Sequence, residues 1–269
     1  MKAEMQETGV LASILSATAI RVADAAPRLS EWKAAARQQG PAPSFARAFR
    51  AADVGIIAES KRRSPSAGAI REDMSALSLA RAYEQGYAAA ISVLTEPDHF
   101  GGSLGDLAAI SHEIGLPTLR KDFIIDPVQV YEARGSGASA ILLIVRALTA
   151  PRLRELASLA HDIGLATLVE IHAEAELEAA LNCAPTAVGV NARDLETLVM
   201  DPSLHEALLP GIPKGVIAVA ESGLRTRADV ERVAGYGADA VLIGTAVAGA
   251  ERPAEAVKAL VGVGRMARR

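Results

Sequence analysis

Eight short apolar segments recur along the chain, and their spacing constrains the fold more than any other feature. They lack the regular polar alternation of a strand with one wet face, so each is typical of a parallel strand covered on both faces. Successive segments begin about 20 to 35 residues apart, which leaves room for one strand, one helix and two loops. The segments are 55–58, 89–94, 117–119, 140–145, 165–169, 187–190, 216–220 and 240–244. This repeat predicts an α/β fold, a (β/α)8 TIM barrel.

The stretches between these segments are rich in Ala, Leu, Glu and Arg at helical spacing, as the helices of such a barrel should be. Four of the stretches run into a glycine shortly before the next strand, which is the residue that a helix C-terminus favours. These glycines are Gly86, Gly135, Gly164 and Gly237. The predicted helices are 74–85, 127–135, 151–164, 173–181, 227–237 and 253–261.

The length of the chain indicates one domain. With 269 residues, of which 50% are hydrophobic, the chain can bury one large core and is short for two ordinary domains. Residues 1–43 precede the barrel. They contain an amphipathic helix with Leu11 and Ile14 on one face, a second helix at 29–39, and a Gly- and Pro-containing linker at 38–43. We therefore predict a single barrel domain over residues 1–269, with residues 1–43 as an N-terminal helical extension and linker.

Composition disfavours several classes of protein. The formal net charge of -4 argues against a nucleic-acid-binding protein, which needs a basic face. The one cysteine, Cys183, cannot form an internal disulfide, and the five histidines show no metal-ligand spacing. The histidines are most simply surface or helix residues, and only His172 lies near a strand end. We expect no metal and no cofactor.

The apolar stretch 9–20 resembles the core of a signal peptide, but the residues before it include Glu4 and Glu7, which disfavour that reading. No run approaches the ~20 apolar residues of a membrane span. We therefore expect a cytoplasmic protein with no membrane partner.

Charged or amide side chains stand at the ends of five of the eight segments. In barrels of this kind, chemistry takes place at the C-terminal ends of the strands. Any one such residue could simply solvate the rim of the barrel, but five in register converge on one place and predict an active site there. The residues are Glu59 and Lys61 after the first segment, then Lys121, Glu170, Asn191 and Glu221.

These residues lie in segments that resemble one family. The segments are 57–66, 92–95 with 100–103, 119–127, 168–170, 191–195 and 220–223, and they occur in the order found in indole-3-glycerol phosphate synthase. The resemblance extends from about Ser44 to the end of the chain. It implies a lyase step of tryptophan biosynthesis, in which 1-(o-carboxyphenylamino)-1-deoxyribulose 5-phosphate cyclises to indole-3-glycerol phosphate with loss of carbon dioxide and water.

The resemblance also implies roles for the strand-end residues. Lys121 resembles the general acid that protonates the ketone oxygen. Lys61 resembles a second lysine that contacts the anthranilate carboxylate and supplies a proton during dehydration. Glu170 resembles the base that removes a ring-carbon proton as water leaves. Charges clustered at a dry barrel mouth should shift one another's pKa values. The residues expected to orient the lysines and the sugar hydroxyls are Glu59, Asn191 and Glu221.

The substrate also needs groups for its two anionic ends and its flat ring. Arg193 could clamp the carboxylate, because guanidinium presents a bidentate fork. A phosphate cradle is expected in the loops after the last two strands, from backbone N–H groups and a helix N-terminus. Ordinary turns and barrel packing would use the same residue types. The expected phosphate residues are Ser222, Gly223, Gly244, Thr245 and Ser64, and the expected ring wall is Phe100, Phe123, Leu142 and Leu195.

Two departures from the family pattern are Ser60, where an apolar residue is usual, and Ala67, where a lysine is common. Two other functions remain open. A phosphoribosylanthranilate isomerase would use a Cys and an Asp as its acid–base pair, but Cys183 lies in or after a helix. A non-catalytic paralogue that binds the same phosphorylated ligands would be expected to lose the strand-end charges. We expect a monomer whose association with other tryptophan-pathway enzymes is at most weak.

Overall fold

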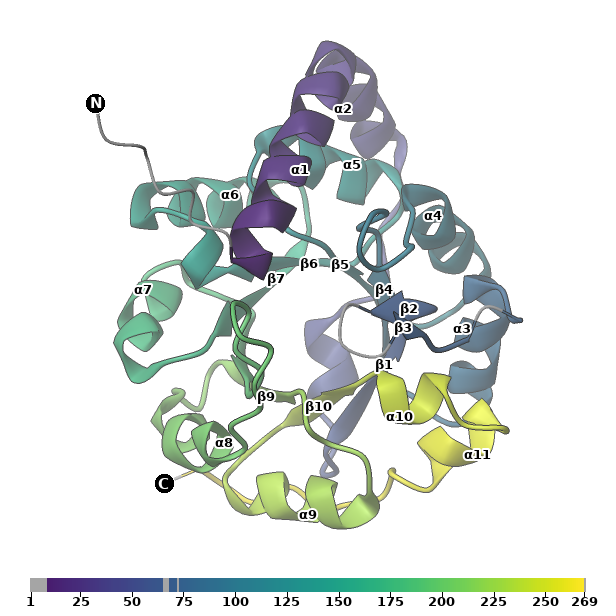
Figure 1. The fold of residues 1–269 in the computed structure, drawn as a ribbon, viewed down its shortest axis with the longest axis vertical. Helices are drawn as coiled ribbons and strands as arrows, with labels where there is room; N and C mark the ends of the chain where they lie inside the picture. The colour runs from purple at the N-terminus through teal and green to yellow at the C-terminus, as the bar shows by residue number, and fades with distance from the viewer. Residues whose placement is uncertain (1–8, 65–67, 72, 269) are drawn as a thin grey trace.

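The computed structural model describes residues 9–64, 68–71 and 73–268. Eight parallel strands close into a barrel in the order β1-β10-β9-β8-β7-β6-β5-β4, with helices around the outside (Figure 1). The predicted TIM barrel is therefore confirmed. The barrel strands are β1 (Gly55–Ser60), β4 (Ala90–Leu94), β5 (Thr118–Lys121), β6 (Ala140–Ile144), β7 (Ala166–Ile171), β8 (Ala187–Asn191), β9 (Ile217–Glu221) and β10 (Ala240–Ile243).

Helices follow the strands and cover the outer face of the barrel. The ends of the predicted helices agree with the structure to within a few residues. The helices of the barrel are α3 (Ala76–Gln85), α4 (Leu104–Glu113), α5 (Pro127–Gly135), α6 (Ala150–Asp162), α7 (Leu177–Leu181), α8 (Ser203–Leu208), α9 (Arg227–Gly235), α10 (Thr245–Ala248) and α11 (Pro253–Lys258). Short 3-10 helices are η2 (Ala46–Phe49), η3 (Val145–Ala147), η4 (Glu174–Glu176) and η5 (Leu209–Gly211).

Several short elements were not predicted from the sequence. Helix α4 buries only Leu107 and Ile110 on its inner face, so its apolar periodicity is weak. Helix α8 is only 6 residues long. The loop after β1 contains the two short antiparallel strands β2 (Arg63–Ser64) and β3 (Gly68–Ala69). Ala67 lies outside the described residues.

Side chains inside the barrel alternate between large and small, which is how a closed barrel fills its interior. Ile57, Leu119, Leu142 and Leu168 are at most 1% exposed, and alanines of neighbouring strands pack between them. A second apolar layer lies between the strands and the outer helices. The interior of the barrel is therefore a packed core.

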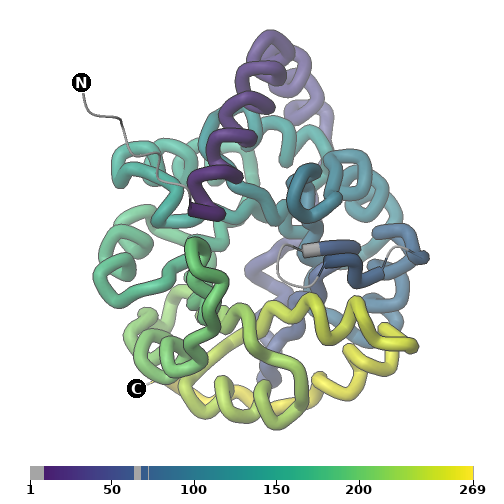
Figure 2. The backbone as a smooth tube through the Cα atoms, viewed as in Figure 1, coloured from purple at the N-terminus to yellow at the C-terminus, as the bar shows by residue number. Residues whose placement is uncertain are grey.

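The N-terminal extension consists of α1 (Val10–Ala25), the 3-10 turn η1 (Ala26–Arg28) and α2 (Leu29–Gln38). Helix α2 packs against α5, where Trp32 and Ala35 lie close to Gly135. The first turns of α1 reach the opening of the barrel, and Figures 1 and 2 show this helix in purple beside the opening. Leu11 and Ile14 are buried there in one cluster with residues of the barrel interior.

No run of ~20 apolar residues was found in the sequence, but the structure joins two apolar stretches into one long helical run. The helical run Val10–Gln38 is long and apolar enough to cross a membrane by length and composition. This is weak evidence for a span, because core helices and signal sequences meet the same criteria. The run also turns at η1, where Pro27 separates α1 from α2.

Candidate active site

A cavity of about 370 Å³ opens at the C-terminal ends of the barrel strands. Of the sixteen site residues predicted from the sequence, fifteen line it. The exception is Ser64, whose side chain lies outside the described part of the chain. The lining residues from the prediction are Glu59, Lys61, Phe100, Lys121, Phe123, Leu142, Glu170, Asn191, Arg193, Leu195, Glu221, Ser222, Gly223, Gly244 and Thr245.

The polar residues that we expected to follow the strands belong to the strands themselves. Lys121, Asn191 and Glu221 are the last residues of β5, β8 and β9, and Glu59 and Glu170 are the last but one of β1 and β7. The parallel ladder continues through them, and Asn191 pairs in register with Glu221. Side chains in a strand alternate between its two faces, so these residues are held by the barrel wall itself.

Glu59 and Lys61 form one ion pair of the site. Lys61 Nζ lies 2.7 Å from Glu59 Oε1, and the Glu59 side chain is buried. Burial opposes the charge on Glu59, but the ammonium groups of Lys61 and Lys121 outweigh it and lower the pKa of this carboxyl. A Cβ atom at Gly244 would overlap a carboxylate oxygen of Glu59 and lie 3.1 Å from Lys61 Cε. Glycine at 244 therefore leaves the space that this ion pair occupies.

Ser60, between these two residues, departs from the family pattern without leaving an unpaired polar group. The residue is 5% exposed, and its hydroxyl donates a hydrogen bond to the carbonyl of Ala76 at 3.4 Å.

Lys121 and Glu170 form a second ion pair across the cavity. Lys121 Nζ lies 3.5 Å from Glu170 Oε2, and Asn191 Nδ2 donates a hydrogen bond to Glu170 Oε1 at 3.1 Å. Burial alone would lower the pKa of Lys121, but the neighbouring carboxyl groups, Glu170 first among them, raise it well above its usual value. Burial would raise the pKa of Glu170, but Lys121 holds it well below the usual range. The free site therefore holds a protonated lysine facing an ionised carboxylate.

Glu221 is the carboxyl group of the site whose pKa is raised. It is 1% exposed, and its Oε1 atom has no hydrogen-bond partner among the residues that the structure describes. Burial and the nearby Glu170 carboxylate raise the pKa of Glu221 well above its ordinary value. A Cβ atom at Gly189 of β8 would overlap this same Oε1 atom. Two buried carboxyl groups with opposite pKa shifts are the arrangement from which acid–base chemistry is built.

Arg193 contacts its own loop as well as the cavity. Its backbone N–H donates to Asn191 Oδ1 at 3.0 Å, and its Nη1 donates to the carbonyl of Leu198 at 3.1 Å. The loop bond orients the guanidinium and leaves its other nitrogens available for a ligand carboxylate.

The backbone bends sharply at the loop after β9. Ser222 and Gly223 both have left-handed φ angles, 67° and 73°. For a residue with a side chain this conformation costs about 1–3 kcal/mol, and such strain clusters at functional sites. Gly244 and Thr245 stand at the start of α10. These two backbone segments line the same cavity, where N–H groups could bind an anion.

An apolar wall faces these polar groups. The rings of Phe100 and Phe123 have centroids 6.5 Å apart and are tilted by 34°. Several other apolar residues of the wall were not predicted from the sequence, and they come from α1 and from the loop after β8. They are Val10, Leu11, Ile14, Leu198 and Met200. An amphipathic helix was predicted for α1, but its apolar face alone gives no indication that it covers the barrel opening.

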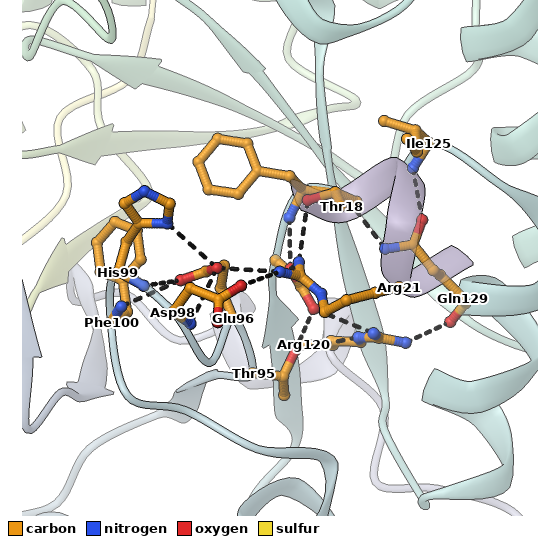
Figure 3. Close-up of polar contacts among 12 residues, drawn as sticks. Thr18, Arg21, Thr95, Glu96, Asp98, His99, Phe100, Arg120, Ile125 and Gln129 are labelled. Carbon is orange, nitrogen blue, oxygen red and sulfur yellow. Dashed lines mark hydrogen bonds and ion pairs between the residues drawn. The ribbon is translucent and has the colours of Figure 1, made fainter. Parts of the chain in front are cut away.

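A polar network that the sequence analysis also missed connects α1 to the loop after β4 (Figure 3). Arg21 of α1 contacts Glu96 at 3.1 Å and Asp98 at 3.2 Å. Glu96 is fully buried, and its carboxylate accepts N–H bonds from Asp98, His99 and Phe100. Arg21 therefore holds the Glu96 carboxylate in place, and this carboxylate in turn binds the backbone of the loop that carries Phe100.

The same network reaches the residue that follows Lys121. Asp122 lies 3.5 Å from Arg21, accepts hydrogen bonds from Thr95 and Arg120, and accepts the N–H of Phe123 at 2.8 Å. Asp122 is 3% exposed, so these partners satisfy a buried charge. The contacts hold Phe100, Phe123 and α1 in one arrangement around the ring side of the cavity.

The expectation that the histidines are surface or helix residues is wrong for His172. It lies directly after β7, is 4% exposed, and has its Nε2 atom 3.2 Å from Glu170 Oε1. Its position directly after a predicted strand, two residues from Glu170, was the available signal.

Comparison with known proteins identifies the family. The model of the family described as indole-3-glycerol phosphate synthase matches residues 11–260. The indole-3-glycerol phosphate synthase of Mycobacterium sp. (strain KMS) is 44% identical over 262 residues, which covers 97% of this chain and 96% of the relative. The enzyme of the same name from Mycolicibacterium vanbaalenii is 45% identical over 263 residues, with the same coverage of both chains.

Solved structures share the fold at low sequence identity. A mutant tryptophan synthase alpha-subunit from Pyrococcus furiosus aligns with a TM-score of 0.60 and 15% identity, covering 77% of this chain and 98% of that one. Thiamine phosphate pyrophosphorylase from the same organism aligns with a TM-score of 0.58 and 16% identity, covering 77% and 93%. These two show the fold alone. The family match and the sequence relatives span nearly the whole chain, so it belongs to the indole-3-glycerol phosphate synthase family.

Proposed function

We propose that the chain is a carbon–carbon lyase that converts 1-(o-carboxyphenylamino)-1-deoxyribulose 5-phosphate into indole-3-glycerol phosphate, with Lys121 as general acid and Glu170 as general base. One observation carries this assignment of roles. A protonated lysine and an ionised carboxylate face each other at 3.5 Å in a cavity that also has an apolar wall.

In the ring-closure step, Lys121 donates a proton to the ketone oxygen of the substrate. The ring carbon that bears the carboxylate then forms a bond to the former ketone carbon, and the oxygen becomes a hydroxyl group. Cleavage of the bond to the carboxylate releases carbon dioxide and restores the aromatic ring. Glu170 and Glu59 keep Lys121 protonated until the substrate oxygen draws the proton away.

The two ends of the substrate are bound on different parts of the wall. Lys61 and Arg193 hold the anthranilate carboxylate, since both are cationic and line the cavity. The backbone at Ser222–Gly223 and at Gly244–Thr245 receives the phosphate. Phe100 and Phe123, with Leu142 and Leu195, enclose the ring.

In the dehydration step, Glu170 removes a proton from a carbon atom of the new ring while Lys61 protonates the departing hydroxyl group. A strongly lowered pKa would make Glu170 a weak base, but its main cause is the charge on Lys121. Once Lys121 has given up its proton, that charge is gone and Glu170 becomes more basic. The first step thereby prepares the base for the second.

We also propose that the described part of the N-terminal extension and the barrel act as one domain, and that the protein is a cytoplasmic monomer that binds neither nucleic acid nor membranes. Leu11 and Ile14 support the first point, because they complete the apolar wall of the site. Any association with other enzymes of the tryptophan pathway should be weak.

The test is turnover by the purified chain, followed through the fluorescence of indole-3-glycerol phosphate. We expect product from the wild type, and a fall in kcat of about two orders of magnitude or more in Glu170→Gln, which keeps the size of the side chain but not the base. Titration with a reduced, unreactive substrate analogue should give similar affinities. Tight binding without turnover in both proteins would indicate a binding paralogue, and weak binding with normal kcat would make Glu170 a recognition residue.

A further inference from the structure

We propose that His172 is a positioning residue for Glu170. Its imidazolium ring contacts one carboxylate oxygen of Glu170, and its positive charge remains beside that carboxylate after Lys121 has given its proton to the substrate. The proposal rests on the proposed role of Glu170 as base. His172 does not line the cavity, so it acts through Glu170 and not on the substrate.

The contacts of Glu170 divide between its two oxygens. Oε1 is 3.2 Å from His172 Nε2 and accepts the hydrogen bond of Asn191 at 3.1 Å. Oε2 is the oxygen that faces Lys121, at 3.5 Å. Because Oε1 accepts the hydrogen bond of Asn191 and lies at ion-pair distance from His172, Oε2 is the oxygen left to take a proton from the substrate.

On its other side, His172 faces a second carboxylate. Its Nδ1 lies 3.8 Å from Glu176 Oε2 of η4, and its backbone N–H donates to the same oxygen at 2.7 Å. Arg146 of η3 holds Glu176 at 2.6 Å, Asp194 at 2.8 Å, and the carbonyl of His172 at 3.4 Å. The imidazole therefore lies between two carboxylates, with the positive charge of Arg146 close by.

The balance of these charges favours the protonated ring. Burial favours neutral imidazole, but Glu170 and Glu176 outweigh burial and the charge of Arg146, and they raise the pKa of His172 to about 9. The ring is therefore cationic near neutral pH. It would lose that charge as the pH rises through about 9.

The charge matters most between the two chemical steps. After Lys121 transfers its proton, Glu170 lies buried near the acidic side chains of Glu221 and Glu59 without its main counter-charge. A buried carboxylate in that situation tends to take up a proton, and a protonated Glu170 cannot act as a base. The imidazolium ring limits this rise in the pKa of Glu170, so the carboxylate stays ionised until dehydration.

The experiment is the pH dependence of kcat for the wild type, His172→Gln, Glu176→Gln and Glu170→Gln, with His112→Gln as the control at an exposed histidine of α4. We expect the kcat of the wild type to fall as the pH rises through about 9. His172→Gln should lower the plateau of kcat about tenfold or more, abolish this alkaline fall, and leave KM within about twofold.

Glu176→Gln provides a second test that does not require removal of the buried ring. Loss of one of the two carboxylates should move the alkaline fall of kcat to lower pH. His112→Gln should match the wild type. The proposal would be overturned if the pH profiles of His172→Gln and Glu176→Gln matched that of the wild type. It would also be overturned if these variants lost the same factor in kcat at every pH and kept the alkaline fall. Wild-type kcat in Glu170→Gln would instead remove the role of Glu170 itself.

Discussion

The carboxylate of Glu59 occupies the space beside Gly244 at the barrel mouth, and a methyl group at position 244 would overlap one of its oxygens. Glu59 in turn pairs with Lys61 at 2.7 Å. Glycine was expected here to let backbone N–H groups approach a phosphate. The structure adds a second reason for it, which is the placement of the Glu59–Lys61 ion pair at the end of the neighbouring strand β1.

Gly244→Ala should therefore impair catalysis even where the phosphate still binds. Displacement of a positioned group by about 1 Å can cost about 10²-fold in rate. We expect kcat/KM to fall by about that factor while the inhibition constant of inorganic phosphate rises much less. The matched control is Gly215→Ala, because no atom lies within 4 Å of a Cβ built there. A parallel loss of phosphate affinity and kcat would assign Gly244 to the phosphate cradle alone.

Lys121→Ala should abolish ring closure and leave the fold intact. Loss of a positioned general acid typically costs about 10²–10⁴-fold in rate. Steady-state kinetics gives the loss of kcat, and calorimetric titration with a reduced substrate analogue gives the affinity, which should change far less. Lys258→Ala, at an exposed position of α11, is the control for removal of a lysine. The assignment fails if the Lys121 variant keeps more than about half of the wild-type kcat.

Glu221→Gln should make the protein more stable near neutral pH and less active. The folded-state pKa of Glu221 is raised, so the unfolded chain ionises this group first and native stability is lost as the pH rises above about 4.3. Glutamine cannot ionise and avoids that loss. We expect the Tm at pH 7.5 to rise by about 2–4 °C or more, which corresponds to about 1 kcal/mol.

The same comparison at about pH 4 should give nearly equal Tm values, because Glu221 is then protonated in both states. Glu251→Gln, at an exposed position, should show no such trend. A Tm difference that grows toward low pH would mean that Glu221 is ionised in the folded protein.

Arg21→Met should weaken substrate binding more than chemistry. The variant removes the contacts to Glu96 and Asp122 that hold α1 and the loop carrying Phe100. We expect KM to rise about tenfold, kcat to change less, and stability to fall by about 1–3 kcal/mol, the scale of hydrogen bonds to charged groups. Arg81→Met removes an exposed ion pair with Glu113 and should cost at most about 1 kcal/mol. Equal effects of the two variants would contradict a role of Arg21 in binding.

The strands and the polar strand ends could be predicted because both follow from local patterns. A run such as Ile217–Glu221 is apolar on both faces, and parallel strands of one barrel end on one rim. The four glycines predicted at helix ends lie there, at the C-cap of α3, at the end of α5 and just after the C-caps of α6 and α9, but not all of them turn the chain. Gly164 and Gly237 take left-handed φ angles, but after α3 it is Tyr87, with φ 66°, that turns the chain rather than Gly86.

The rest of the site depends on contacts between distant segments. The apolar face of α1 predicts that the helix packs, but it does not indicate the surface against which Leu11 packs. The acidic partners Glu96 and Asp98 of Arg21 lie 75 and 77 residues away in sequence. The raised pKa of Glu221 depends on burial and on Glu170, and both are established only when the barrel closes.

The space left by Gly189 has a consequence for how this barrel can evolve. The Glu221 carboxyl group fills the volume that a side chain at 189 would need, so a larger residue there must be accompanied by a shorter acid on β9. Gly189→Ala combined with Glu221→Asp should therefore be less damaging than the sum of the two single changes, since residues in contact are energetically coupled. Relatives that carry a side chain at 189 are expected to have lost the long acid at 221 as well, and substitutions at this pair of positions should be accepted together or not at all.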